Sequence, residues 1–176
     1  SANSRLPMSL YGDLNGQINA LELGEKRLHE LLDEYGRDRA EEALAALKER
    51  AATMMRAQIA DLPDGTVSAE DWLDNDGITD EALKIALDLR IDGDRMVMDF
   101  SRSSPACAGP VNISRSTCVA ACYVALKHIF GEVPANAGVL EPVEFVIDEG
   151  SLLSVTAPKH VGGYTETILR LIDVVF

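Results

Sequence analysis

The fold is decided by residues 83–100, which read LKIALDLRIDGDRMVMDF. Apolar residues alternate with polar or small ones on both sides of Asp92 and Gly93, and this period of two is typical of strands with one buried face. An Asp-Gly pair between two such runs is a strong signal for a two-residue hairpin loop. With that pair as the loop, Leu89 would face Met96, and apolar residues would meet along one face. The stretch therefore predicts a β-hairpin.

The segments before the hairpin predict two helices and one more strand. Apolar residues recur at helical spacing through residues 10–61, and Gly36 interrupts the pattern. A capping-box pair follows this glycine, so we expect two long helices joined by a tight turn, an αα-hairpin. Residues 66–73 predict a third strand, with Trp72 as its large apolar anchor.

The segments after the hairpin alternate between helix and strand. Residues 117–130 predict a helix, residues 143–147 a strand, and residues 165–175 a last helix. This order, with antiparallel pairing, indicates an α+β fold in which two further helices pack on an antiparallel sheet. We expect a helical hairpin over residues 1–62 and an α+β portion over residues 63–176, together one compact domain excised from a longer chain.

Composition limits the partners of the chain. Its formal net charge of −13 over 176 residues disfavours nucleic acid and anionic membrane surfaces, because phosphates attract the opposite sign. No apolar run approaches the roughly 20 residues that span a bilayer, and no signal peptide is recognisable. Three cysteines indicate no disulfide framework, so reduced thiols in the cytoplasm are expected. Neither the cysteines nor the three histidines form a metal-ligand pattern.

An acidic stretch at residues 72–83, WLDNDGITDEAL, has some features of a calcium-binding loop. An EF-hand loop needs oxygen ligands at loop positions 1, 3, 5 and 12 and glycine at position 6. Placing Gly77 at position 6 sets Asp74 and Asp76 at positions 3 and 5, but leaves Trp72 and a leucine at positions 1 and 12. Two of the four ligands are missing, so we predict an exposed acidic turn and no metal site. A calcium-binding module is the less favoured alternative.

Two glycine-led segments that lead into helices are the best candidates for a binding site. One covers residues 109–117 and contains Arg115, whose guanidinium can bind a carboxylate or a phosphate. The other covers residues 162–167. Glycines, hydroxyls and unpaired backbone N–H groups at a helix start favour anions. The alternative is that Ser116 and Thr165 are ordinary N-cap residues. No nucleophile–base arrangement, P-loop or dinucleotide fingerprint is recognisable.

Three stretches together resemble one protein family. Residues 3–36 contain GDLNGQINALELGEKRLHELLDEYG, residues 99–112 read DFSRSSPACAGPVN, and residues 136–175 contain NAGVLEPVEFVIDEGSLLSV and HVGGYTETILRLIDVV. Nearly end to end, the chain is similar to the hydantoinase B/oxoprolinase family. This family comprises the B subunit of ATP-dependent hydantoinases, the matching half of 5-oxoprolinase and the corresponding subunit of acetone and acetophenone carboxylases. The chain departs from the family at Arg102, where glycine is usual, and within residues 162–167, where the family's asparagine is replaced.

The resemblance implies part of an ATP-dependent enzyme that acts on a small molecule. The reaction would be hydrolysis of a cyclic amide, such as a hydantoin or 5-oxoproline, or carboxylation of a ketone. An A-type partner subunit would handle ATP, and metal-binding histidines would lie upstream of residue 3. ATP and a divalent metal would therefore belong to the full enzyme, and this segment would bind no cofactor and be inactive alone. Its catalytic residues are unknown, and its candidates for substrate or anion binding are Asn112, Arg115, Thr165 and Glu166.

A second function stays open beside the enzymatic one. The segment could be a non-catalytic structural or assembly domain of the same subunit, which contacts the A-type partner or a second copy in a homo-oligomer. The sequence does not decide between hydrolysis and carboxylation, because one scaffold hosts both chemistries.

Overall fold

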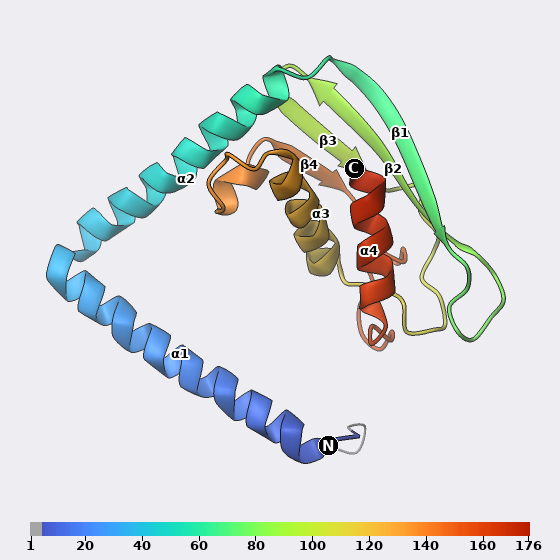
Figure 1. The fold of residues 1–176 in the computed structure, drawn as a ribbon, viewed down its shortest axis with the longest axis horizontal. Coiled ribbons are helices and arrows are strands. Elements are labelled where there is room, and N and C mark those ends of the chain that lie inside the picture. Colours follow the sequence, from blue (N-terminus) through green and yellow to red (C-terminus); the bar gives the residue numbers. More distant parts are fainter. Residues whose placement is uncertain (1–4) are drawn as a thin grey trace. The chain divides into compact units, whose positions relative to one another are not determined.

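The computed structural model describes residues 5–176, and the chain divides into two compact units, residues 1–46 and 47–176. Helix α1 runs over Pro7–Tyr35 and helix α2 over Arg37–Ala60, and a single residue, Gly36, joins them (Figure 1). The predicted N-terminal helical pair is confirmed. The domain boundary at residues 62 and 63 stays a prediction, and residues 1–4 of the predicted hairpin lie outside the described residues.

The first unit consists of α1 and the start of α2. No residue of α1 is buried, although its sequence carries an apolar stripe at helical spacing. Among the residues that the structure describes, no helix is both long and apolar enough to cross a membrane.

The second unit contains a four-stranded sheet in the order β1-β2-β3-β4. Its strands are β1 (Gly65–Leu73), β2 (Leu83–Asp92), β3 (Arg95–Asp99) and β4 (Val143–Val146). β1 pairs antiparallel with β2, which confirms the predicted third strand. Trp72 at the end of this edge strand is 47% exposed, whereas Leu73 is buried. The prediction of Trp72 as an apolar anchor is therefore wrong.

The hairpin of β2 and β3 is present, but its register differs from the predicted one. Asp92 pairs with Arg95, so the loop lies one residue further along the chain, and Leu89 faces Met98 rather than Met96. Apolar residues still meet on one face, because a shift of two residues leaves every side chain on its original side of the sheet. Alternation alone therefore could not separate the two registers.

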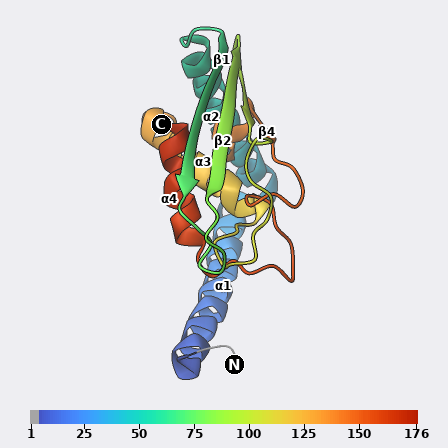
Figure 2. The same ribbon diagram turned by 90° about the vertical axis from the view of Figure 1, so that its right-hand side faces the viewer.

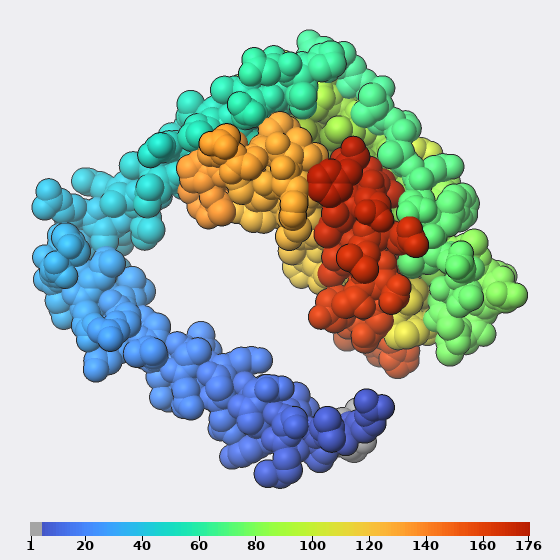
Figure 3. Space-filling model, viewed as in Figure 1, coloured from blue at the N-terminus to red at the C-terminus, as the bar shows by residue number. Residues whose placement is uncertain are grey.

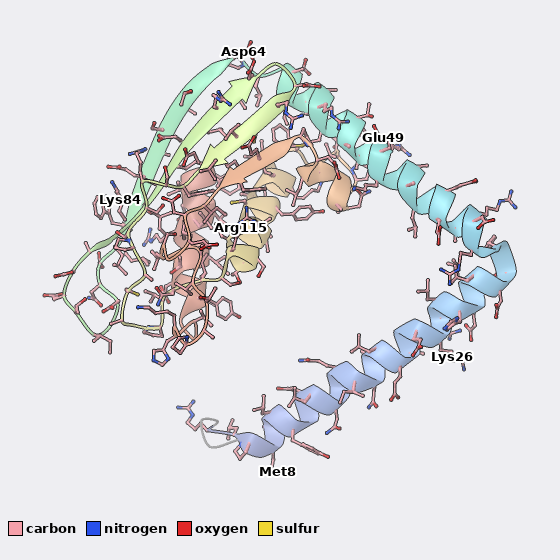
Figure 4. The ribbon with its side chains drawn as sticks, turned by 180° about the vertical axis from the view of Figure 1, so that it is seen from behind. Met8, Lys26, Glu49, Asp64, Lys84 and Arg115 are labelled. Atoms are coloured by element: carbon pink, nitrogen blue, oxygen red, sulfur yellow. The ribbon has the colours of Figure 1, made fainter. Side chains whose placement is uncertain are left out.

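Loop geometry and one side-chain contact fix the observed register. Gly93 has a φ of 58°, and Asp94 keeps a negative φ, which is the pattern of a type II′ hairpin turn. The Gly93 N–H also donates to the carboxylate of Asp64 at 2.8 Å (Asp64 is labelled in Figure 4). Asp64 lies in the connection from α2, so a contact across 29 residues of sequence supports the observed turn.

β4 is parallel to β3, which corrects the prediction of a purely antiparallel sheet. After β3 the chain passes through α3 (Arg115–Ile129) and the short 3₁₀ helix η1 (Ala137–Leu140) before Val143 pairs with Met96. A parallel pair requires such a long crossover, usually with a helix in it. The α+β class is confirmed, with a mixed sheet.

The core of the second unit lies between the sheet and its helices. Helix α4 (Tyr164–Val175) contacts α3, β1 and β2, and Figures 1 and 2 show it beside these elements. In the space-filling view α4 and β1 lie in direct contact (Figure 3). Each fully buried large side chain contributes about 1.5–3 kcal/mol through the hydrophobic effect. Such residues include Met55, Ile59, Ile85, Met98, Phe100, Leu126 and Leu171.

Arg102, which departs from the family pattern, forms an ion pair on the sheet. Its guanidinium donates two hydrogen bonds of 2.7 Å to Asp88 on β2 and lies 3.6 Å from Glu70 on β1. The hydrogen bonds from Arg102, and then the one from Ser68, lower the pKa of Asp88 to about 2. The arginine thus links the loop after β3 to two strands.

Replacing Arg102 with alanine is expected to lower the stability of the protein at neutral pH but not in acid. Asp88 has a native pKa below its usual value, so the pair stabilises the fold above about pH 4, and this stabilisation is lost as the pH falls towards 2. The Arg102→Ala variant should be less stable than the wild type at neutral pH, and this difference should vanish near pH 2. Urea unfolding between pH 2 and 7 measures the difference in the free energy of unfolding between variant and wild type. Arg90→Ala is the control, because Arg90 is exposed on β2. A difference that does not depend on pH would contradict the assignment.

Candidate functional site

The structure brings the two glycine-led segments together at what we call the loop junction, residues 107–113 and 160–167. The Gly163 N–H donates to the carbonyl of Pro110 at 2.9 Å. The hydroxyl of Thr167 donates to the carbonyl of Val111. These bonds tie the start of α4 to the loop that precedes α3. All four candidate residues therefore lie in or beside one region of the second unit.

Asn112 lies at the centre of the loop junction and is fully buried. Its Oδ1 accepts a hydrogen bond from the Cys107 N–H at 2.9 Å. Its Nδ2 donates to three backbone carbonyls, those of Cys107, Gly109 and His160, at 3.2, 2.9 and 3.1 Å. An amide group has two donor hydrogens, so three carbonyls share them. The polar atoms of Asn112 are thus engaged in holding the two loops together.

Asp76, from the acidic stretch, is buried against the same junction. Its carboxylate accepts hydrogen bonds from the backbone N–H groups of Ile78, Thr79 and Gly109 at 2.8, 2.7 and 2.8 Å. These bonds, with those of Thr79 and Ile78 the strongest, hold the pKa of Asp76 well below its usual range. The prediction of an exposed turn is therefore wrong for Asp76, although the residues on both sides of it are exposed.

Gly109 contacts the acidic turn too closely for any side chain. A Cβ at this position would lie 1.9 Å from the carbonyl oxygen of Asp76. Sequence reasoning missed the contact because it treated residues 72–83 and 109–117 separately. The sequence Asp-Gly-Ile-Thr at residues 76–79 was the available signal, since an Asp side chain often accepts hydrogen bonds from the residues that follow it in a turn.

The helix starts differ from the simple N-cap interpretation. Ser114 is the N-cap of α3, and its hydroxyl accepts from the Thr117 N–H at 3.3 Å, so Ser116 lies inside the first turn. Gly163 occupies the N-cap position of α4, and the described residues supply no side-chain cap there. Thr165 is exposed on the first turn. The alternative that Ser116 and Thr165 are N-caps is wrong.

A hollow of about 710 Å³ opens at the start of α3. This α3 hollow is lined by residues 114–116, by residues 147, 149 and 150 in the turn after β4, and by residues 154–156. Its volume is within the range of about 300–1,000 Å³ that is typical of ligand pockets. Arg115, labelled in Figure 4, lines it and donates from Nη2 to the carbonyl of Phe145 at 3.3 Å.

Glu166 lines a different hollow of about 250 Å³, between α4 and the end of β1. Trp72, Asp74 and Asn75 share this α4 hollow with it, so the acidic stretch and the second glycine-led segment do meet. Arg115 and Glu166 therefore do not form one constellation. They flank the loop junction in separate hollows.

The described part of the chain offers neither a metal centre nor a reactive thiol. No three His, Cys, Asp or Glu side chains gather there so as to hold a metal ion. Cys107, Cys118 and Cys122 are buried and unpaired. Burial raises the pKa of the Cys107 thiol, and a hydrogen bond with Cys118 together with burial raises that of Cys122. Thiols with raised pKa values are poor nucleophiles.

Comparison with known proteins gives a consistent result over the whole chain. The family model described as hydantoinase B/oxoprolinase matches residues 1–176. The caprolactamase subunit beta of Pseudomonas jessenii is 32% identical over 177 residues, covering 98% of the chain and 30% of that subunit. The 5-oxoprolinase of Dictyostelium discoideum is 30% identical over 168 residues, covering 93% of the chain and 13% of that protein. The chain thus spans less than a third of the length of either relative.

Two solved structures share the fold. The crystal structure of the ATP-dependent caprolactamase from Pseudomonas jessenii matches with a TM-score of 0.82 at 32% identity, over 94% of the chain and 29% of its own. The nucleotide-free structure of acetone carboxylase matches with a TM-score of 0.71 at 16% identity, over 82% of the chain and 21% of its own. At that identity the second likeness concerns the fold alone.

Proposed function

The chain belongs to the hydantoinase B/oxoprolinase family, and from this premise we propose that it is part of a B-type subunit that opens cyclic amides in an ATP-dependent reaction. The observation that supports this most is its likeness to an ATP-dependent caprolactamase, with a TM-score of 0.82 at 32% identity. Hydrolysis adds water across a ring C–N bond: a lactam such as caprolactam or 5-oxoproline then leaves a carboxylate and an amine on one chain, and a hydantoin leaves a carboxylate and a carbamoylated amine. The proposed substrates are small lactam-like rings such as hydantoins, caprolactam and 5-oxoproline.

Carboxylation of a ketone is the second candidate reaction. It has less support, because the likeness to acetone carboxylase is at 16% identity and concerns the fold alone. The relatives at 30% identity or more bear the names of enzymes that act on cyclic amides.

We assign the candidate residues different parts in this function. Arg115 offers a guanidinium at the α3 hollow, where it can hold an anionic oxygen of the substrate. Glu166 offers a carboxylate at the separate α4 hollow, and it is the alternative to Arg115 as the residue that contacts the ring, through a hydrogen bond accepted from a ring N–H. Asn112 positions both helix starts, because its polar atoms are engaged within the loop junction. Thr165 is exposed next to Glu166 and can contribute a hydroxyl.

The residues described here do not fit the metal and nucleotide that the family implies. The described part of the chain has no cluster that could hold a metal ion, and its sequence has no P-loop. We therefore propose that ATP and a divalent metal bind to an A-type partner and to other parts of the subunit. The proposal includes a cytoplasmic location, which the unpaired cysteines support.

Replacing Arg115 with alanine, or Glu166 with glutamine, is expected to reduce ATP-dependent turnover of the cyclic amide in the intact enzyme complex. Loss of a hydrogen bond to a charged group costs about 1.5–3 kcal/mol, so kcat/KM should fall about 10- to 100-fold. Formation of the ring-opened product from 5-oxoproline, caprolactam and hydantoin, with and without ATP, measures this, as a new amine for the two lactams and as a carbamoylated amino acid for hydantoin. Arg90→Ala is the matched control, because Arg90 is exposed on β2, away from both hollows.

The same experiment separates catalysis from assembly. If both variants assemble normally and retain wild-type kinetics, then this segment acts as a structural domain that contacts the A-type partner or a second copy. If ATP-dependent fixation of carbon dioxide onto a ketone occurs in place of amine release, then carboxylation replaces hydrolysis as the reaction.

A further inference from the structure

Ser154 is a mostly buried residue whose hydroxyl the described chain itself does not use. The residue is 8% exposed, and its hydroxyl has no hydrogen-bond partner within residues 5–176. Every side-chain oxygen that is fully enclosed in the described residues has a hydrogen-bond partner. The hydroxyl of Ser154 has none, so it must be accessible from outside the core. Ser154 lines the α3 hollow, which is therefore where its hydroxyl opens. An unpartnered hydroxyl at the wall of a hollow is a polar group available to a ligand.

The start of α3 makes one side of this hollow favourable for an anion. Ser114 caps the N–H of Thr117, whereas the N–H groups of Arg115 and Ser116 belong to the first turn, where a helix supplies no partner. The helix dipole adds partial positive charge there. The Arg115 guanidinium donates a hydrogen bond to the carbonyl of Phe145, and this contact holds the positively charged group beside the hollow.

Glu149 gives the same hollow an opposite charge. It lies exposed in the turn after β4 and lines the hollow. A simple anion such as phosphate would be repelled by this carboxylate. A ligand with an anionic group at one end and an ammonium group at the other would satisfy both sides.

We propose that the α3 hollow binds a linear amino acid, with its carboxylate at Arg115 and the start of α3 and its ammonium group at Glu149. This rests on the proposed function, because opening a lactam such as caprolactam or 5-oxoproline yields such a molecule. The carboxylate also reaches the hydroxyl of Ser154. The hollow is thus a binding site for the ring-opened product, and its volume of about 710 Å³ accommodates a chain of several carbons.

Calorimetric titration of the intact protein with single-ended and double-ended probes tests the site. The probes are 6-aminohexanoate, 4-aminobutyrate, hexanoate and inorganic phosphate. We expect 6-aminohexanoate or 4-aminobutyrate to bind at least about tenfold more tightly than hexanoate. All three probes offer a carboxylate to Arg115, but only the amino acids offer an ammonium group to Glu149. Replacing Glu149 with glutamine should remove this difference. Stronger binding of phosphate than of either amino acid would overturn the proposal.

Two neighbouring serines provide the matched variants. Ser154→Ala should weaken amino acid binding about fivefold while leaving the Tm unchanged, because its hydroxyl bonds to no other described residue. Ser151 is equally buried, but its hydroxyl accepts from the Leu153 N–H at 3.0 Å. Ser151→Ala should therefore lower the Tm and leave binding unchanged. Unchanged binding in Ser154→Ala and Arg115→Ala would overturn the site.

Failure of this inference is distinguishable from failure of the proposed function. ATP-dependent amine release by a protein that binds none of the probes at millimolar concentration would retain the function and remove the site. Probe binding that depends on Arg115 and Glu149, in an enzyme complex without amide hydrolysis, would retain the site and remove the function.

Discussion

Replacing Gly109 with alanine is expected to lower the stability of the second unit by about 3 kcal/mol, at the upper end of the cost of overpacking. The added Cβ would lie 1.9 Å from the carbonyl oxygen of Asp76 and 2.8 Å from its carbonyl carbon. Both are backbone atoms, so no side-chain rotation can relieve the clash. The loop must move away from the acidic turn, and that movement breaks the 2.8 Å hydrogen bond from the Gly109 N–H to the Asp76 carboxylate.

Thermal unfolding monitored by circular dichroism measures this effect. A loss of about 3 kcal/mol corresponds to a Tm lower by roughly 10 °C in a protein of this size. Gly162→Ala is the matched control, because a Cβ there would have no atom within 4 Å and Gly162 has no positive φ. A Gly109→Ala variant with the Tm of the wild type would show that the turn and the loop do not approach each other as described.

The elements of the fold followed from local patterns, whereas their long-range pairing did not. Alternation across residues 83–100 was sufficient to predict two strands, because a half-buried strand requires it. The register depended on a choice between two local turn signals, Asp92-Gly93 and Gly93-Asp94, and the long-range contact between Asp64 and Gly93 supports the second. The parallel direction of β4 depended on the path of the crossover through α3. Both the Asp64 contact and this path are properties of tertiary structure.

The sequence predicted the two segments that form the candidate site, but not the contacts that their residues make. Glycines and hydroxyls near a helix start correctly indicated segments of unusual backbone, and the structure brings both segments together. Composition could not show that Asn112 is enclosed by carbonyls, or that Arg115 and Glu166 line separate hollows. It also suggested that Asp76 was a solvent-exposed charge, because acidic runs usually are. Asp76 is buried because its carboxylate accepts a hydrogen bond from Gly109, which lies 33 residues further along the chain.

Replacing Asn112 with aspartate is the second change with a large expected effect. The two side chains have the same shape, but the substitution exchanges the donor Nδ2 for a carboxylate oxygen. That oxygen would face three carbonyl oxygens at about the observed 2.9–3.2 Å, with no donor between them. An uncompensated buried charge costs about 3–5 kcal/mol, and the three carbonyls lose their shared donor as well. We expect the variant to unfold at a much lower urea concentration than the wild type.

The pH dependence of that loss identifies its cause. At low pH the introduced carboxyl takes up a proton and can again donate one hydrogen bond, so the deficit relative to the wild type should be smaller at pH 5 than at pH 8. Asn75→Asp is the matched control: Asn75 is exposed, and the N–H of Gly77 donates to its Oδ1, a bond that a carboxylate preserves. This control adds the same charge within the same unit and should leave stability nearly unchanged. If Asn112→Asp is as stable as Asn75→Asp, then Asn112 does not hold the loop junction together, and its amide is available to bind substrate directly.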